Sequence, residues 1–160
     1  MMHIVRNIAL VLIFTLGPLS APAQATVVKF DRLEAVLQSR DERVHVINFW
    51  ATWCAPCIRE LPLFEKLHRG KNSLIKVTLI NLDFADKLEK VNSFIARKDI
   101  RSEVLLLDEI DYNTWIDKVD PAWSGAIPAT LIFNAKTGRR KFIERELRED
   151  DLDKLIAEIQ

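Results

Sequence analysis

The stretch that decides the fold is Phe49-Trp50-Ala51-Thr52-Trp53-Cys54-Ala55-Pro56-Cys57, which holds both cysteines of the 160-residue chain. Just before the cysteines, residues 44–50 are rich in β-branched and aromatic side chains, a composition typical of a buried strand. Just after them, apolar residues recur every three positions from Ile58 to Leu67 and predict a helix over 57–68. The cysteine pair therefore lies where a buried strand leads into a helix.

This position gives the two cysteines different chemistry. The backbone N–H groups and the positive end of the dipole at a helix N-terminus stabilise a thiolate, so the first cysteine, Cys54, is the expected attacking group. Cys57 lies one turn further on, within reach to resolve a mixed disulfide. Pro56 falls in the first turn, where its missing N–H costs no helical hydrogen bond. The pattern predicts a redox-active dithiol.

Two other roles for the pair are weaker. A bridge between Cys54 and Cys57 closes a very small loop, so it removes little entropy from the unfolded chain and stabilises the fold weakly. A structural zinc site needs four ligands, and His45 and His68, the remaining candidates, form no spaced pair and are interpreted as surface residues. The chain also contains no glycine-rich nucleotide fingerprint. We therefore expect neither a metal nor a cofactor.

The first 25 residues have the layout of a secretory signal. Arg6 lies near the start, residues 8–16 are apolar apart from one threonine, and Ala23-Gln24-Ala25 has the small-x-small pattern of a cleavage site. A membrane-spanning helix needs about 20 apolar residues, so an uncleaved anchor is the weaker alternative. We expect cleavage after Ala25 and a periplasmic domain over 26–160. In such a compartment stray thiols become disulfides, which suits a redox function.

The remaining chain alternates strand and helix patterns and indicates an α/β fold with a mixed sheet flanked by helices on both faces. Lysine plus arginine equals aspartate plus glutamate at 23 each, so no basic excess points to nucleic acid. Residues 108–123 are expected to be irregular, with one helical turn around Trp115. Further strands are expected over 27–30, 74–82, 104–107, 129–133 and 139–145, and further helices after Asp31, over 86–98 and after Asp150 or Asp151.

The cysteine motif and the following Glu60-Leu61-Pro62 resemble the thioredoxin superfamily, and most closely its exported TlpA/ResA-type thiol–disulfide reductases. A second signature is Gly125-Ala126-Ile127-Pro128-Ala129-Thr130-Leu131-Ile132-Phe133. In the family this proline is cis and faces the cysteines. The resemblance covers roughly residues 27–159 and implies a thioredoxin-like fold, a cis bond before Pro128, and substrate contacts from the backbone of Ile127.

The chain departs from the thioredoxin pattern at two points. Thioredoxins proper carry a buried aspartate on the strand before the motif, and here that residue is Asn48, which cannot exchange a proton near neutral pH. In the exported reductases a glutamate one turn after the second cysteine is the candidate, and Glu60 holds that place. The alternative is a solvated acid favoured by the helix dipole alone. The glycine usual after the last strand is replaced by Leu147-Arg148, which affects the shape of the substrate groove.

The four tryptophans fall into two groups. Trp50 is expected in the core, whereas Trp53, next to the attacking cysteine, is expected to form with Pro56 the apolar surface that receives substrate. Trp115 and Trp123 flank the irregular segment and are expected to pack beneath it. A partner-binding lip is the alternative for this second pair.

The resulting hypothesis is an extracytoplasmic, monomeric enzyme that reduces disulfides in protein substrates and is itself re-reduced by a membrane thiol-relay donor. The resemblance implies apocytochrome c as one client. An oxidase or isomerase is the alternative, because direction depends on reduction potential, but Ala55-Pro56 is close to the Gly-Pro of reducing members. A non-catalytic binding module is a third possibility, and the presence of both cysteines, Pro56 and Pro128 argues against it.

Overall fold

The computed structural model describes residues 23–70 and 72–160, so residues 1–22, most of the predicted leader, lie outside the described residues. One six-stranded sheet with the order β1-β4-β3-β2-β5-β6 forms the centre of the molecule. The first four of these strands run parallel, and β5 runs antiparallel to both of its neighbours. The strands are β1 (Thr26–Val28), β2 (Val44–Trp50), β3 (Ile75–Asn81), β4 (Glu103–Leu107), β5 (Ala129–Asn134) and β6 (Arg140–Ile143).

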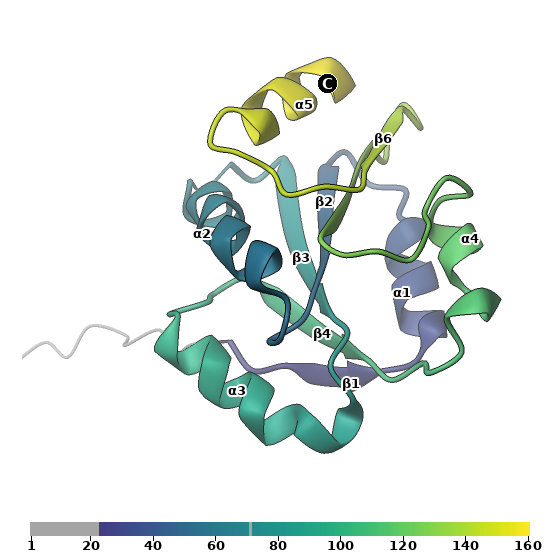
Figure 1. Ribbon diagram of the computed structural model, residues 1–160. Helices are drawn as coiled ribbons and strands as arrows, with labels where there is room; N and C mark the ends of the chain where they lie inside the picture. The colour runs from purple at the N-terminus through teal and green to yellow at the C-terminus, as the bar shows by residue number, and fades with distance from the viewer. Residues whose placement is uncertain (1–22, 71) are drawn as a thin grey trace, which may run out of the picture.

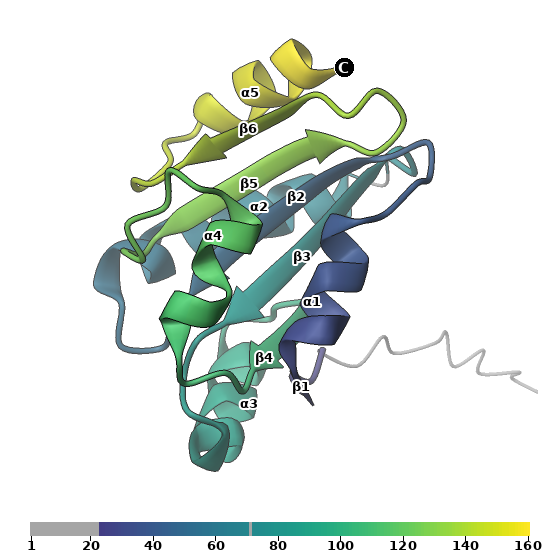
Figure 2. The same ribbon diagram turned by 90° about the vertical axis from the view of Figure 1, so that its right-hand side faces the viewer.

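Helices cover both faces of this sheet (Figure 1). One face carries α2, α3 and α5, and the other, seen in Figure 2, carries α1 and α4. The helices are α1 (Phe30–Leu37), α2 (Ala55–Arg69), α3 (Leu88–Arg97), α4 (Ile116–Val119) and α5 (Asp151–Ile159), with 3-10 turns at Ala85–Lys87 and Tyr112–Thr114. The predicted α/β, thioredoxin-like architecture is therefore confirmed. Among the described residues, no helix is both long enough and apolar enough to cross a membrane.

The central strand β2 divides the core into two apolar clusters. Every residue of β2 is buried, because the strand has neighbours on both sides and helices on both faces. Val46 and Trp50 point towards α2, whereas Ile47 and Phe49 point towards α1. The strand alternation places Asn48 on the α2 face, between Val46 and Trp50. A polar amide thus lies inside an apolar layer, directly below the helix that begins at the cysteine motif.

The element boundaries differ from expectation mainly at helix starts. Helix α2 begins at Ala55 because Cys54 occupies its N-cap. The N-cap of α1 is Lys29 and not Asp31. The Asp31 carboxylate accepts the N–H of Arg32. At α5 the N-cap residue, Asp150, makes no capping hydrogen bond through its side chain. The expected helical structure around Trp115 is present: the second 3-10 turn ends just before this residue, and α4 begins just after it.

Two interpretations of individual side chains are decided by burial. His45 is not a surface residue: its Nε2 lies 3.0 Å from Asp41 Oδ1, and its ring stacks on Phe133 with centroids 4.8 Å apart. The prediction was wrong because β2 is covered along its whole length, including its first residues. The indoles of Trp115 and Trp123 are 1% and 3% exposed, so they are core residues and do not form a partner-binding lip.

Candidate active site

The two cysteines form a disulfide at the N-terminus of α2. Cys54 is the N-cap residue, and its Sγ accepts the backbone N–H of Cys57 at 3.3 Å. Cys54 keeps 6% of its surface exposed, whereas Cys57 is completely buried. An incoming sulfur can therefore reach only Cys54 from solvent, which is the asymmetry expected of an attacking and a resolving cysteine.

The surroundings of Cys54 favour negative charge on its sulfur. The first turn of α2 contains no acidic side chain, and Pro56 lies in that turn. The N–H of Cys57 points at Cys54 Sγ in the disulfide form, and the unpaired N–H groups of the helix end add their dipole. These contributions lower the pKa of a thiol and raise its reactivity at neutral pH.

The peptide bond between Ile127 and Pro128 is cis, as the resemblance implied. It lies opposite the disulfide, with the carbonyl oxygen of Ile127 3.8 Å from Cys54 Sγ. Pro128 is buried at the start of β5, and Ile127 is partly exposed. The backbone of residue 127 therefore borders the sulfur that faces solvent.

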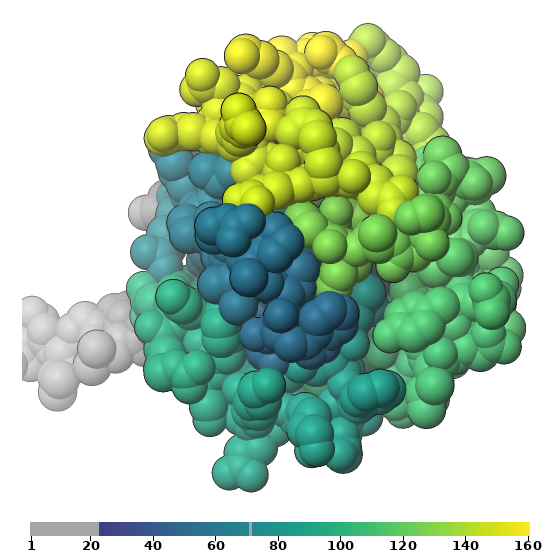
Figure 3. Space-filling view, viewed as in Figure 1, coloured from purple at the N-terminus to yellow at the C-terminus, as the bar shows by residue number. Residues whose placement is uncertain are grey.

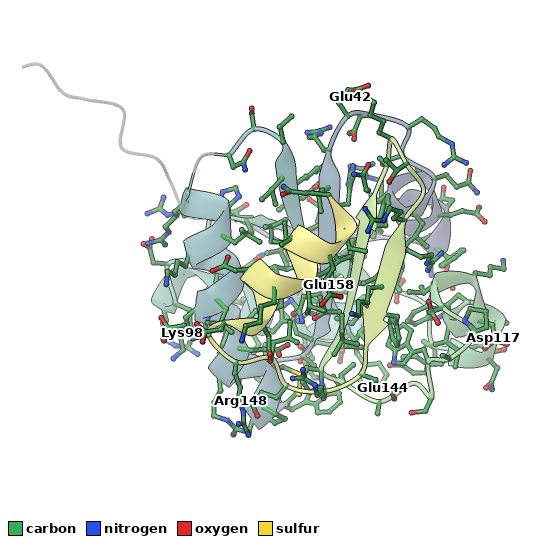
Figure 4. The ribbon with its side chains drawn as sticks, turned by 90° about the horizontal axis from the view of Figure 1, so that it is seen from above. Glu42, Lys98, Asp117, Glu144, Arg148 and Glu158 are labelled. Atoms are coloured by element: carbon green, nitrogen blue, oxygen red, sulfur yellow. A yellow bond between two sulfur atoms is a disulfide. The ribbon has the colours of Figure 1, made fainter. Side chains whose placement is uncertain are left out.

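The loop that precedes this bond is held from two sides. The indole N–H of Trp123 donates to the carbonyl of Ala126 at 2.8 Å. The Glu144 carboxylate accepts the backbone N–H groups of Ser124 at 3.1 Å and Ala126 at 3.2 Å, together with the Ser124 hydroxyl. Partial burial would raise the pKa of Glu144, but these hydrogen bonds outweigh it and hold the pKa below its usual range. Glu144, visible just beyond the end of β6 in Figure 4, thus positions the loop.

Glu60 is a buried carboxyl group, only 1% exposed, and not the solvated acid of the alternative interpretation. Its Oε1 accepts the amide of Asn48 at 2.7 Å, and its Oε2 accepts the backbone N–H of Leu147 at 2.6 Å. Burial raises the pKa of Glu60 to about 7, against the lowering effect of these two hydrogen bonds. A carboxyl group with this pKa can both accept and return a proton near neutral pH.

Asn48 connects Glu60 to the strand that follows the cis bond. Its Nδ2 lies 3.1 Å from Thr130 Oγ1 and 3.3 Å from the carbonyl of Ala129, in addition to its contact with Glu60. Its Oδ1 has no hydrogen-bond partner among the described residues. The residue that replaces the thioredoxin aspartate is therefore the central donor of a buried network spanning β2, α2 and β5.

A second buried carboxylate orients the loop that carries the motif. Asp83 accepts the N–H of Thr52 at 2.7 Å and its hydroxyl at 2.6 Å, as well as the amide of Asn81 at 2.9 Å. Sequence reasoning missed both Asp83 and Glu144. Asp83 carried a usable signal, because it follows a buried parallel strand whose carboxyl end meets the same sheet edge as the cysteines. Glu144 carried none.

Beside the disulfide the surface is hollowed. Trp53 is 65% exposed and borders, with Tyr112, Ile116 and Ile127, a hollow of about 380 Å³. In Figure 3 this region lies between the blue segment at the start of α2 and the green segment that contains α4. All seven residues predicted for the site thus lie around one end of the sheet. Those residues are Trp53, Cys54, Pro56, Cys57, Glu60, Ile127 and Pro128. Among the described residues, no cluster of three or more potential metal ligands occurs.

Comparison with known proteins agrees with this geometry. The Redoxin family model matches residues 22–137. Thioredoxin-like protein YneN of Bacillus subtilis is 37% identical over 71 residues, which are 44% of this chain and 42% of that protein. Thiol-disulfide oxidoreductase ResA of Bacillus cereus is 32% identical over 116 residues, which are 71% of this chain and 60% of that protein. The chain thus spans less than two thirds of either relative.

Among solved structures, a thioredoxin-related protein from Neisseria meningitidis serogroup B superposes with a TM-score of 0.62. The two are 26% identical, and the match covers 76% of this chain and 87% of that one. The fold, the two signatures and the matched family agree with one another. The chain therefore belongs to the Redoxin family, with a thioredoxin-like fold and a Cys-X-X-Cys pair, Cys54 and Cys57, at the start of α2.

Proposed function

We propose that this protein is an extracytoplasmic thiol–disulfide oxidoreductase that reduces disulfides in protein substrates through Cys54 and Cys57. The observation that carries the proposal is the setting of the Cys54 sulfur. It caps a helix N-terminus, keeps a small exposed surface, and lies 3.8 Å from the carbonyl of Ile127 in the cis bond. This is an arrangement in which a substrate disulfide can approach one sulfur while the substrate backbone pairs beside it.

The first step is attack by the Cys54 thiolate on one sulfur of the substrate disulfide. A new S–S bond forms between Cys54 and the substrate, and the substrate's own S–S bond breaks. The departing sulfur leaves as a thiolate and takes up a proton. The N–H of Cys57, which donates to Cys54 Sγ in the disulfide form, supports the thiolate before attack.

The second step needs a proton acceptor, because the Cys57 thiol is completely buried. We propose that the Glu60 carboxylate takes this proton, since its pKa of about 7 leaves it partly ionised at neutral pH. The Cys57 thiolate then attacks Cys54 Sγ, breaks the mixed disulfide and releases the second substrate sulfur, which is protonated. Two electrons pass to the substrate, and the protein ends with the Cys54–Cys57 disulfide.

Return to the dithiol requires an external dithiol donor, and we propose a membrane thiol relay for this role. Apocytochrome c is the client that family resemblance implies. The proposal that the protein is exported depends on the signal-like residues 1–25. Cleavage after Ala25 would leave a mature chain that starts at β1. Such cleavage removes two hydrogen bonds, from Ala23 N–H to the Ile100 carbonyl and from Ala25 N–H to Asn92 Oδ1. The mass of the exported protein tests this: a mature start other than Thr26 contradicts the proposed site.

The direction of electron flow is tested by the reduction potential of the Cys54–Cys57 pair. A value near that of thioredoxin, about −270 mV, supports a reductase, whereas one near −120 mV contradicts it and makes the protein an oxidase. A Cys57→Ala variant should accumulate mixed disulfides with its clients, and a Cys54→Ser/Cys57→Ala variant, as the matched control, should not. If Cys54→Ser retained the biological role, a non-catalytic binding module would replace the enzyme hypothesis.

A further inference from the structure

A strip of exposed apolar side chains extends from the active site. Among the described residues six large apolar side chains are exposed, and four of them line either the 380 Å³ hollow or a much shallower hollow that adjoins it. These four, the apolar strip, are Trp53, Phe84, Ile110 and Tyr112, with 65, 62, 73 and 38% of their surface exposed. The hollows share Leu82 and Tyr112 in their walls, so the strip is continuous from the residue beside Cys54.

The strip stands on well-anchored segments. Trp53 and Phe84 flank the Thr52–Asp83 hydrogen bonds, which join the motif loop to the end of β3. The ring of Tyr112 contacts the buried Trp115, with centroids 5.6 Å apart. Apolar side chains held exposed in this way, next to a reactive group, are typical of an interaction site. They present a surface that a partner can cover without first reorganising it.

The border of the strip is acidic. Residues 108–120 contain five carboxylates and one lysine, in a chain that is balanced overall. Asp108 pairs with Lys29 and Asp120 with Arg140, and the single lysine, Lys118, lies over the ring of Phe30. The remaining three carboxylates form no ion pair within 4 Å in the described part of the chain. They are Glu109, Asp111 and Asp117, the last of which projects from α4 in Figure 4. Glu109 accepts the backbone N–H of Phe30 at 3.1 Å and interacts electrostatically with Lys29, and Asp111 accepts the N–H of Asn113 at 3.2 Å.

We propose that the apolar strip and these three carboxylates form the docking surface for substrates, and that they select basic polypeptides with an apolar residue beside the reactive cysteine. The inference rests on the proposed function, because the occupant is the chain attached to Cys54. An apolar side chain of that substrate fills the 380 Å³ hollow between Trp53, Tyr112 and Ile127. Lysine or arginine residues further along then face Glu109 and Asp111.

Charge makes a basic polypeptide the best occupant. A second copy of this chain, bound through the same surface, would place its three carboxylates against these three and be repelled. An anionic lipid surface would be repelled as well. Complementary charge acts mainly on encounter and register, so it raises the rate at which substrate reaches Cys54 and leaves the sulfur chemistry unchanged. The effect is weakened by salt, whose Debye length is about 10 Å at 0.1 M.

The test compares the reduced protein with disulfide peptides that differ only in charge. Each peptide has leucine beside one cysteine, followed by three lysines or by three glutamates, and uncharged hydroxyethyl disulfide reports the basal chemistry. We expect the lysine peptide to be reduced about tenfold faster than the glutamate peptide at low salt, and the difference to shrink as salt is added.

Two triple variants separate local charge from net charge. Glu109→Gln/Asp111→Asn/Asp117→Asn keeps the acceptor oxygens and removes three negative charges at the strip. Glu149→Gln/Asp153→Asn/Glu158→Gln removes three near and on α5. The first variant should lose most of the preference for the lysine peptide, and the second should keep it. Equal loss in both variants overturns the docking surface, because a long-range effect of net charge then explains the preference.

The apolar part is tested by replacing leucine with serine in the lysine peptide. The native protein should reduce the leucine peptide severalfold faster, and Tyr112→Ser, which removes an exposed ring from the wall of the 380 Å³ hollow, should lose this advantage. Equal rates for all peptides, with normal reduction of hydroxyethyl disulfide, overturn the docking surface and leave the proposed function intact. Failure to reduce any of the disulfides overturns the proposed function and the docking surface with it.

Discussion

Replacing Glu60 by glutamine should stabilise the oxidised protein above neutral pH. Burial raises the pKa of Glu60 from 4.5 to about 7 in the folded protein. Between these values the folded protein holds a proton that the unfolded chain has released, so the free energy of unfolding falls as pH rises through this window. Each tenfold change in acid dissociation is worth about 1.4 kcal/mol, which makes the loss about 3 kcal/mol once the pH exceeds 7.

Glutamine has the shape of the protonated side chain and never ionises. Its oxygen can accept the N–H of Leu147, as Glu60 Oε2 does at 2.6 Å. The amide nitrogen of the new glutamine then faces the Asn48 side chain. The Oδ1 of Asn48 has no hydrogen-bond partner among the described residues, and it can accept from the glutamine if the Asn48 amide rotates by half a turn. Turning it weakens the Asn48 contacts to β5, at a cost of about 1 kcal/mol. The expected net gain above pH 7 is therefore about 2 kcal/mol.

The measurement is urea unfolding of the oxidised native and Glu60→Gln proteins at pH 4, 6 and 8.5. At pH 4, where Glu60 is protonated, Glu60→Gln should be less stable by about 1 kcal/mol, and as the pH rises the two stabilities should cross and diverge to about 2 kcal/mol in favour of the variant. Glu149→Gln, at a side chain that is 77% exposed, is the matched control and should show no such divergence. A difference that stays constant from pH 4 to 8.5 would refute the argument, because Glu60 would then not titrate in that window.

Three further outcomes follow from burial and hydrogen bonding. Asp83→Asn should lower the free energy of unfolding by about 1–3 kcal/mol through weakened charge-assisted bonds, while the exposed Asp86→Asn should change it by less than about 0.5 kcal/mol, both in urea. Leu33→Ala, at a fully buried position, should cost about 2–5 kcal/mol by the same assay, and Leu74→Ala, at a side chain 53% exposed, much less. In the reduced protein the pKa of the Cys54 thiol should lie below the free value of about 8.5, as ultraviolet absorbance of the thiolate will report.

The features that sequence could predict depend on neighbours along the chain. The strand over 44–50 and the helix that follows the cysteines are determined by local hydrophobic patterns, and the structure has both. The cis bond before Pro128 was reached through family resemblance, because no local pattern distinguishes it from a trans bond. Helix starts were less accurate, since Asp31 has the residue type of a cap but lies inside the first turn.

The features that sequence could not predict depend on contacts between distant segments. The burial of Glu60 requires Leu147, which lies 87 positions further on and contributes through its backbone, so its side-chain identity gives no hint. Glu144 acts on a loop 18 to 20 positions earlier in the chain. His45 was misjudged for a related reason: its exposure is set by the strands that pair with β2 and by the stacked Phe133.

The residue types at positions 48 and 60 depend on each other. The amide nitrogen of Asn48 lies 2.7 Å from Glu60 Oε1, so an aspartate at position 48 would bring two carboxyl groups together in a buried layer. Two such groups cannot both ionise at this distance, and one would remain protonated near neutral pH. An amide avoids this repulsion and donates a hydrogen bond instead. The departure from the thioredoxin pattern at Asn48 thus allows a carboxyl group with a raised pKa on α2, and in the proposed mechanism this group, on the helix that begins at the cysteine motif, is the proton acceptor.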